Sequence, residues 1–356
     1  MFAHLARRSR AALAVILSLA LLAVPAAANP TLLVDLHTGE VLHSDDGGDP
    51  WHPASLTKLM TAYVAFAAVN SGRIGLDTPI KVSQHAWNQA PSKSGLEVGS
   101  AITLRDALYI LVVKSANDIA VAIAEAVSGS EDAFVAEMNR MAAAMGLSAT
   151  HYENPHGLHH ARQVTSARDL AVLVLYLRRD FPQFMPIFGT EKVQLGKASF
   201  ETNNSLIEHF AGTTGMKTGY VCASGLNIVA TINRQGRELL GVVLGGSSAR
   251  ERNEMAAELF LRGLSGEIRG TGRSVVQLPN TTAAPVDMRP LICGKQAKEY
   301  VAAREAAYPM GLEGRPSYLT DEVHGAVYQA TDLGRLRDIP LPRRRPALAP
   351  MTTAFN

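Results

Sequence analysis

Two segments with strand patterns, far apart in the chain, enclose a long stretch with helical patterns, and this order limits the possible folds more than any other feature. In both "TLLVDLHTGEVLHSDD" (31–46) and "GLNIVATINRQGRELLGVVLGG" (225–246), apolar or β-branched runs flank a turn with a glycine, which predicts a hairpin. Apolar residues recur at helical spacing in 103–130, 130–148, 165–180 and 248–264. The order predicts an α/β (α+β) fold, with an antiparallel sheet flanked by helices and an inserted all-helical subdomain.

The first 28 residues have a different character from this folded part. Arg7, Arg8 and Arg10 precede the apolar run "AALAVILSLALLAV", and small residues end the segment at Ala28. This is the pattern of a secretory signal peptide cleaved after Ala28, and an uncleaved anchor is the alternative. We therefore expect an exported, periplasmic protein. Without these three arginines, 31 Lys and Arg remain against 32 Asp and Glu, so no basic field favours nucleic acid as a partner.

The chain beyond residue 266 loses the regular periodicity. We expect three parts: a signal peptide (1–28), a folded domain (29–266) and a C-terminal extension (267–356). Within the extension, "RSVVQLPN" (273–280) is interpreted as one strand, and the tail, rich in Pro and Arg, is expected to be extended or disordered. The tail predicts no C-terminal membrane anchor. Arg343–Arg345 indicate either a solvated tail or contact with anionic lipid or cell-wall polymer.

The mature part contains two cysteines, Cys222 and Cys293. In an oxidising compartment two thiols can form one disulfide. Two free buried thiols are the alternative, and the sequence leaves both open.

The segment "ASLTKLM" (54–60) places Ser55 and Lys58 three residues apart at the start of an apolar helix. No Asp or Glu follows Lys58 until Asp77, so a buried ammonium there has no local partner. Burial and the positive end of the helix dipole both lower a lysine pKa from its usual value of about 10.4. A neutral lysine is a base that can activate the serine hydroxyl as a nucleophile, and the Ser55 N–H is suited to stabilise an oxyanion.

Two further motifs follow in order. "KSANDIA" places Ser115 and Asn117 downstream, and "GMKTGYV" contains Lys217, Thr218 and Gly219. Ser115 can pass a proton between the base and a leaving amine, and the Asn117 amide can hold a substrate backbone. Lys217 and Thr218 suit a carboxylate, and Gly219 allows an extended substrate to approach a strand edge.

With these motifs, the chain resembles the serine-type D-alanyl-D-alanine carboxypeptidases of the peptidase S11 family, which are low-molecular-mass penicillin-binding proteins related to class A β-lactamases. The resemblance extends over about Thr31 to Gly263 and includes "ASLTKLMTAYVAF", "NPHGLHH" and "KTGYVCASGLNIVA". It implies a β-lactamase/transpeptidase-like fold, with 29–266 as the catalytic domain. It also implies that Ser55 forms an ester while a peptidoglycan stem pentapeptide loses its last D-Ala. Arg252 would help receive the terminal carboxylate, β-lactams would inhibit, and no cofactor or metal is implied.

Some residues leave alternatives open. Tyr220 stands where relatives often have histidine, and Glu153 lies outside the E-x-x-L-N pattern with which class A β-lactamases deacylate. The alternatives are a D,D-endopeptidase that cuts peptide cross-links, a β-lactamase-like enzyme and a non-catalytic penicillin-binding protein. A zinc site is a weaker interpretation because no H-E-x-x-H pattern accompanies the nearby histidines, which are His151, His156, His159 and His160. Asp118 is expected to fix the turn beside Asn117.

Overall fold

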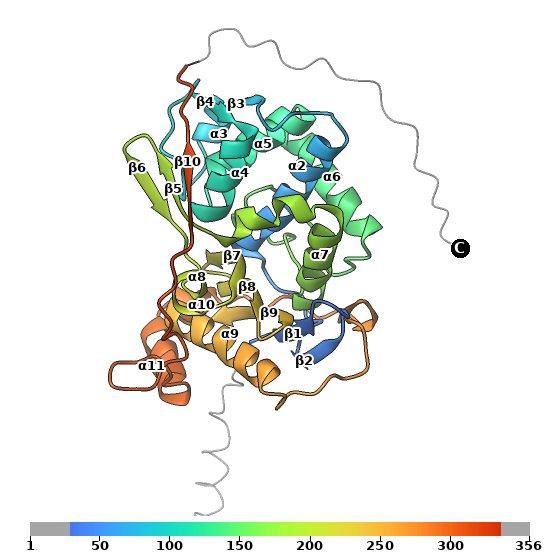
Figure 1. Ribbon diagram of the computed structural model, residues 1–356, viewed down its shortest axis with the longest axis vertical. Helices are drawn as coiled ribbons and strands as arrows, with labels where there is room; N and C mark the ends of the chain where they lie inside the picture. Colours follow the sequence, from blue (N-terminus) through green and yellow to red (C-terminus); the bar gives the residue numbers. More distant parts are fainter. Residues whose placement is uncertain (1–28, 336–356) are drawn as a thin grey trace, which may run out of the picture.

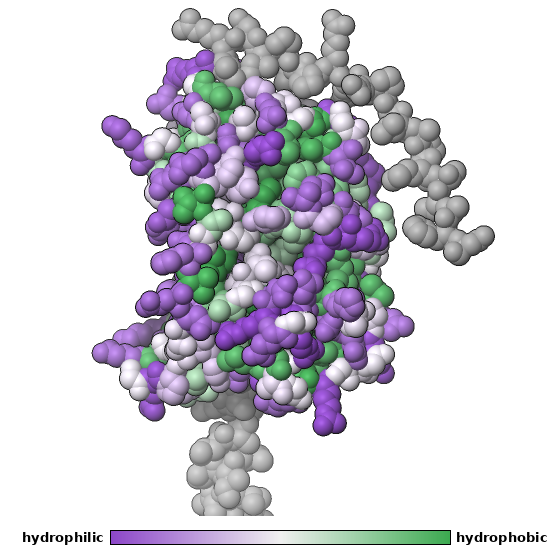
Figure 2. Space-filling view, in the orientation of Figure 1, coloured by the Kyte–Doolittle hydropathy of each residue, from purple (hydrophilic) through white to green (hydrophobic). Residues whose placement is uncertain are grey.

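The computed structural model describes residues 29–335. The predicted signal peptide with its cleavage site and the tail with Arg343–Arg345 lie outside the described residues. Figure 1 shows a sheet with its helices in the lower part of the molecule and a mainly helical part above it. On the face drawn in Figure 2, hydrophilic side chains are interspersed with separate hydrophobic patches. Within residues 29–335, none of the helices combines the length and apolar character needed to cross a membrane.

The sheet joins the two predicted hairpins. It is antiparallel and five-stranded, in the order β2-β1-β9-β8-β7. The strands are β1 (Thr31–Asp35), β2 (Val41–Asp45), β7 (Thr213–Val221), β8 (Gly225–Arg234) and β9 (Arg237–Gly246). Both hairpins are confirmed, and β1 pairs with β9 to connect them.

Successive residues of the central strands pack into different hydrophobic cores, because side chains of a strand point alternately to the two faces of the sheet. Leu33 and Val243 pack with Phe260 of α9 (Ala249–Leu264). Their neighbours Leu32 and Val242 belong to the larger core shared with the helical part. The sheet is therefore buried on both faces, and β7 is its outer strand on the side of the predicted K-T-G motif.

The helical part begins with a short 3-10 turn and contains the predicted helices. Its elements, with two short strands, are η1 (Ala54–Thr57), α2 (Lys58–Asn70), β3 (Pro79–Lys81), α3 (Gln84–Trp87), β4 (Ala101–Thr103), α4 (Leu104–Val113), α5 (Asn117–Ser128), α6 (Glu131–Ala144) and α7 (Ala167–Asp180). Three of these helices begin at a side-chain N-cap: Thr103, Ser130 and Ser166 each accept a hydrogen bond from a backbone N–H three residues on.

The predicted helical segment 103–130 is divided in the structure. α4 ends at Val113 and α5 begins at Asn117, because Ser115 adopts a positive φ of 60° that a helix cannot contain. The Asn117 N–H donates to the carbonyl of Ser92 instead of to a residue of α4. This interruption places Ser115 outside both helices.

The sequence patterns did not predict the remaining elements. They are η2 (Pro182–Gly189), β5 (Thr190–Leu195), β6 (Ala198–Glu201), α8 (Leu206–His209), η3 (Val275–Gln277), α10 (Arg289–Ile292), α11 (Ala297–Ala307) and β10 (Ala326–Ala330). The strand predicted at 273–280 is wrong, because Ser274 and Gln277 form a capping box that starts the 3-10 turn and buries Val275.

The C-terminal extension folds back along the rest of the chain up to residue 335. β10 pairs in parallel with β5, and the Tyr328 ring stacks on Tyr109 of α4. In Figure 1 this red segment passes from α11 beside the sheet to the helical part. The domain boundary at residue 266 stays a prediction.

A disulfide joins Cys222, just after β7, to Cys293, just after α10. Of the two alternatives that the sequence left open, the structure has the bonded pair. The two residues are 71 apart in the chain, so the bond closes a long loop in the unfolded state.

We predict that the double variant Cys222→Ser, Cys293→Ser has a free energy of unfolding lower by about 2–4 kcal/mol, since the unfolded chain is no longer constrained. Urea denaturation followed by circular dichroism measures this. Reductant should lower the midpoint of the wild type and leave that of the double variant unchanged. Equal midpoints of the oxidised wild type and the double variant would contradict the prediction.

Candidate active site

Ser55 lies in a cleft of about 380 Å³ between β7 and the helical part. The residues predicted for the site that line this cleft are Ser55, Ser115, Asn117, Thr218, Gly219 and Arg252. Lys58 and Lys217 are buried behind its wall, at 1% and 3% exposure. All eight predicted residues therefore lie in or directly behind one cleft.

Lys58, the first residue of α2, makes three polar contacts. Its Nζ lies 2.9 Å from Ser55 Oγ, 2.8 Å from Asn117 Oδ1 and 2.6 Å from the carbonyl oxygen of His156. Burial, with a smaller contribution from the charge of Lys217, holds the pKa of Lys58 well below its ordinary value. A neutral amine is therefore favoured at this position.

The hydrogen-bond partners orient this neutral amine. The amide of Asn117 has a fixed orientation because its Nδ2 donates to the carbonyl of Ala90 at 2.9 Å, so Oδ1 faces Lys58. Oδ1 and the His156 carbonyl can only accept, and they use the two N–H groups of the amine. Its lone pair is left to face the Ser55 hydroxyl, which is the arrangement of a general base and its nucleophile.

Ser115 reaches the cleft because the chain turns between α4 and α5. Asp118 is fully buried and accepts hydrogen bonds from the N–H and hydroxyl of Ser94, close in the chain to Ser92, whose carbonyl accepts from the Asn117 N–H. The predicted structural role of Asp118 fits these contacts.

Two further cations lie at the β7 end of the cleft. Lys217 Nζ donates to the carbonyl of Thr218 at 2.9 Å, and burial together with the charge of Arg252 lowers the pKa of Lys217 to about 7. Arg252, on α9, is held by the side chain of Asn253 and the carbonyl of Asn203, and burial lowers its pKa to about 10. In the part of the chain that the structure describes, these hydrogen bonds go to neutral oxygens and not to carboxylates. An incoming carboxylate would therefore be attracted by both residues.

Glycines bring the backbone of three segments together around Ser55. A Cβ on Gly219 would lie 2.9 Å from the Ser55 nitrogen and 3.0 Å from the Pro53 carbonyl oxygen. A Cβ on Gly157, whose φ is +89°, would lie 1.9 Å from the carbonyl oxygen of Ala54. The sequence suggested that Gly219 admits a substrate; the structure adds that it allows β7 to pack on the turn that carries the serine.

The sequence did not identify the backbone acceptors of the site, the carbonyls of His156 and Ala90. The "NPHGLHH" segment drew attention to histidine side chains, yet its contribution to Lys58 is a main-chain oxygen. The side chains belong to separate contacts: His151 with Glu153, His156 with Glu131, and His159 with the ring of His52. Residues 29–335 contain no group of three or more His, Cys, Asp or Glu arranged to hold a metal ion.

Comparison with known proteins places this geometry in a family. The sequence model described as D-alanyl-D-alanine carboxypeptidase, peptidase S11, matches residues 21–248. The chain belongs to the peptidase S11 family. Among curated members, D-alanyl-D-alanine carboxypeptidase DacD of Salmonella typhimurium is 34% identical over 236 residues, which are 64% of this chain and 60% of DacD. DacF of Bacillus subtilis is 31% identical over 238 residues, 65% of this chain and 61% of DacF. The matched region thus spans about 60% of these relatives' length.

Solved structures of this family share the fold. The carboxypeptidase DacD from Francisella tularensis has a TM-score of 0.64 at 26% identity, over 68% of this chain and 71% of that one. Penicillin-binding protein D2 from Listeria monocytogenes, solved in a cefotaxime-bound form, has a TM-score of 0.60 at 26% identity, over 66% of this chain and 96% of that one. The predicted transpeptidase-like fold is confirmed.

The lowered pKa of Lys217 would make the binding of a carboxylate in this cleft dependent on pH. Below pH 7 or so Lys217 is charged in the free protein, and above it the charge is lost. We predict that the affinity of the Ser55→Ala variant for a peptide with a free C-terminal carboxylate falls as pH rises above about 7, because binding then requires proton uptake. Calorimetry from pH 6 to pH 9, in buffers of different ionisation enthalpy, measures both the affinity and the number of protons taken up on binding. Adding Lys217→Ala should remove this pH dependence; a flat affinity profile before that change would contradict the prediction.

Proposed function

We propose that this protein is a serine-type D-alanyl-D-alanine carboxypeptidase that removes the terminal D-Ala from peptidoglycan stem pentapeptides. One observation carries the proposal: Nζ of the buried Lys58, whose pKa burial holds well below its ordinary value, lies 2.9 Å from the hydroxyl oxygen of Ser55. A non-catalytic binding protein has no need of such a base.

The proposed reaction has two halves. In the first, Ser55 Oγ attacks the carbonyl carbon of the penultimate D-Ala while Lys58 takes the hydroxyl proton. The C–N bond then breaks, and the proton reaches the leaving amine, with Ser115 as the relay. In the second half, water loses a proton to Lys58 and attacks the ester carbon; the C–O bond to Ser55 breaks, the proton passes from Lys58 to Ser55 Oγ, and the shortened peptide leaves. One water is consumed, and one D-Ala is released for each turnover.

The cations at the β7 end explain the preference for a chain terminus. The carboxylate of the last D-Ala would meet Lys217, Thr218 and Arg252, so binding energy depends on a free C-terminus. A cross-link lacks this carboxylate at the cleaved bond. The endopeptidase alternative draws support from the D-alanyl-D-alanine endopeptidase of Pseudomonas aeruginosa, which is 33% identical over 221 residues. The carboxylate-binding arrangement favours the carboxypeptidase.

The proposed site of action is the bacterial periplasm, where peptidoglycan is remodelled. The N-terminal sequence pattern and the Cys222–Cys293 disulfide both support export into an oxidising compartment. The near-neutral charge of the mature sequence gives no support to nucleic acid as a partner.

The test is incubation with purified muropeptides, with chromatography to score the bond that breaks. We expect the wild type to release D-Ala from pentapeptides and the Ser55→Ala variant to release none. Lys58→Arg removes the base, because guanidinium stays protonated; its D-Ala release should also be lost. Cleavage of cross-linked dimers without release of D-Ala would favour the endopeptidase, and binding without cleavage a non-catalytic role.

We also propose that β-lactams acylate Ser55 and leave slowly. None of the described residues that line the cleft is Asp or Glu, so no carboxylate there positions a hydrolytic water. Glu153 is instead engaged with His151 and Arg162. We predict that a fluorescent penicillin stays bound to Ser55 through gel filtration. Turnover of benzylpenicillin many times per second by the purified protein would contradict this and favour a β-lactamase.

A further inference from the structure

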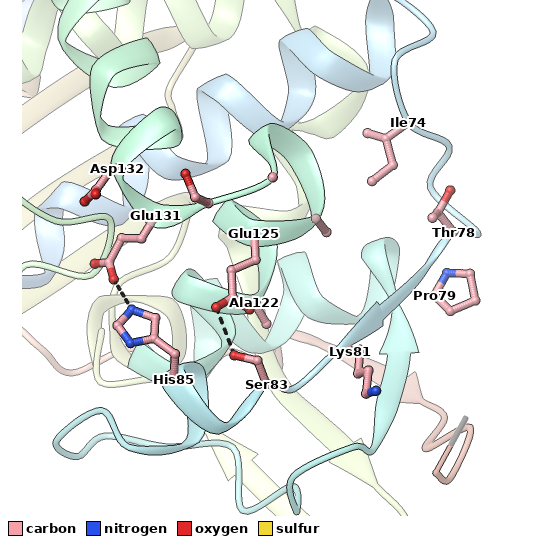
Figure 3. A pocket seen from close by; sticks show the side chains of 13 residues that line it. Ile74, Thr78, Pro79, Lys81, Ser83, His85, Ala122, Glu125, Glu131 and Asp132 are labelled. Carbon is pink, nitrogen blue, oxygen red and sulfur yellow. Dashed lines mark hydrogen bonds and ion pairs between the residues drawn. The ribbon is translucent and has the colours of Figure 1, made fainter. Parts of the chain in front are cut away.

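A second cavity, of about 610 Å³, lies between the β3–α3 segment and the facing ends of α5 and α6. Figure 3 shows His85 of α3 and Glu131 of α6 joined on its wall, and Ser83 joined to Glu125. His85 Nε2 lies 2.6 Å from Glu131 Oε2. Because the cavity is separate from the cleft with Ser55, these contacts are not part of the site described above.

The other oxygen of Glu131 lies near the ring of His156. Glu131 Oε1 lies 3.6 Å from Nε2 of His156, whose side chain is 6% exposed. His156 Nδ1 accepts a hydrogen bond from the N–H of Leu158, so in the neutral ring Nε2 carries the proton. Burial lowers the pKa of His156 to about 3, so the ring is neutral. At 3.6 Å the Nε2–H of the neutral ring is beyond hydrogen-bond distance of Glu131, and it makes an electrostatic contact with the carboxylate.

Both histidines belong to segments that hold the catalytic pair. The main-chain carbonyl of His156 accepts from Lys58 Nζ at 2.6 Å. Five residues after His85, the carbonyl of Ala90 accepts from Nδ2 of Asn117 and thereby fixes the oxygen that faces Lys58. Glu131 thus contacts one residue in each of two segments: one provides the carbonyl that accepts from Lys58, and the other the carbonyl that orients Asn117.

We propose that Glu131 is a positioning residue for the reaction: through His156 and His85 it holds the two acceptor groups that direct the lone pair of Lys58 at Ser55. The inference rests on the proposed function. An acidic residue in the first turn of α6 also interacts favourably with the helix dipole. That ordinary role would alter the stability of α6 and would not alter the rate at which Ser55 is acylated.

The experiment measures acylation of the full-length protein by a fluorescent penicillin, with the limiting rate separated from the dissociation constant of the initial complex. Glu131→Ala should lower the limiting rate by about 10-fold or more, as removal of an outer-shell orienting group does. The dissociation constant should change less than about 2-fold, because Lys217 and Arg252 are untouched. Glu131→Gln can still bond to both histidines and should recover most of the rate.

Asp132→Ala is the matched control. Asp132 follows Glu131 on α6, lines the same cavity and is exposed, so its removal should leave the acylation rate unchanged. His85→Ala, at a half-exposed position, is a milder variant that should also lower the limiting rate and should not add fully to Glu131→Ala. It keeps the proposal testable if Glu131→Ala does not fold.

Three outcomes would overturn the proposal. The first is a wild-type limiting rate in folded Glu131→Ala, or in His85→Ala if Glu131→Ala does not fold. The second is an equal loss of limiting rate in Asp132→Ala. The third is a lower melting temperature of Glu131→Ala without a lower limiting rate. Failure of the proposed function has a different signature, because the wild type itself would then neither react with penicillin nor release D-Ala.

Discussion

The structure is organised around a lysine that water does not reach. An amine at 1% exposure loses the solvation that would keep it charged. The charge of Lys217 also opposes the protonation of Lys58, and the charge of Arg252 opposes that of Lys217. Neutral Lys58 needs acceptors without negative charge, and it finds an amide oxygen and a peptide carbonyl. A carboxylate in either place would restore the ammonium and remove the base.

This requirement explains strained features that stability alone would not favour. Ala54 and Ser115 both have positive φ, which costs energy for a residue with a side chain. Ala54 precedes the nucleophile and Ser115 interrupts two helices, so each strained residue brings a hydroxyl into the cleft. Buried cations and strained backbone lower the stability of the folded protein, and proteins commonly accept this loss where activity requires such groups.

The sequence predicted the parts of the fold that depend on local chemistry. Both hairpins and the main helices follow from the spacing of apolar residues and from turn residues that lie within a few positions of each other. Seven of the eight site residues were predicted from the three motifs and their order, and Arg252 from the family resemblance. The acceptors at His156 and Ala90 were not, because any residue type has a carbonyl and the tertiary fold alone decides where it points. β10 was not predicted either, because it pairs with β5, more than a hundred residues earlier in the chain, and the tertiary fold alone decides this pairing. At 273–280 an apolar run suggested a strand, but the capping of Ser274 by Gln277 is a local signal that the interpretation overlooked.

The C-terminal extension contributes to the geometry of the cleft although it lies beyond the family match. Arg304 of α11 pairs with Glu251, which is fully buried and also accepts the N–H of Ser247. Glu251 precedes Arg252 on α9, so the extension helps fix the turn from which the guanidinium enters the cleft. A buried carboxylate that lost its arginine would be costly, and the cost would fall on the first turn of α9. The end of the cleft that contains Arg252 therefore depends on residues 267–335 as well as on the region shared with the relatives.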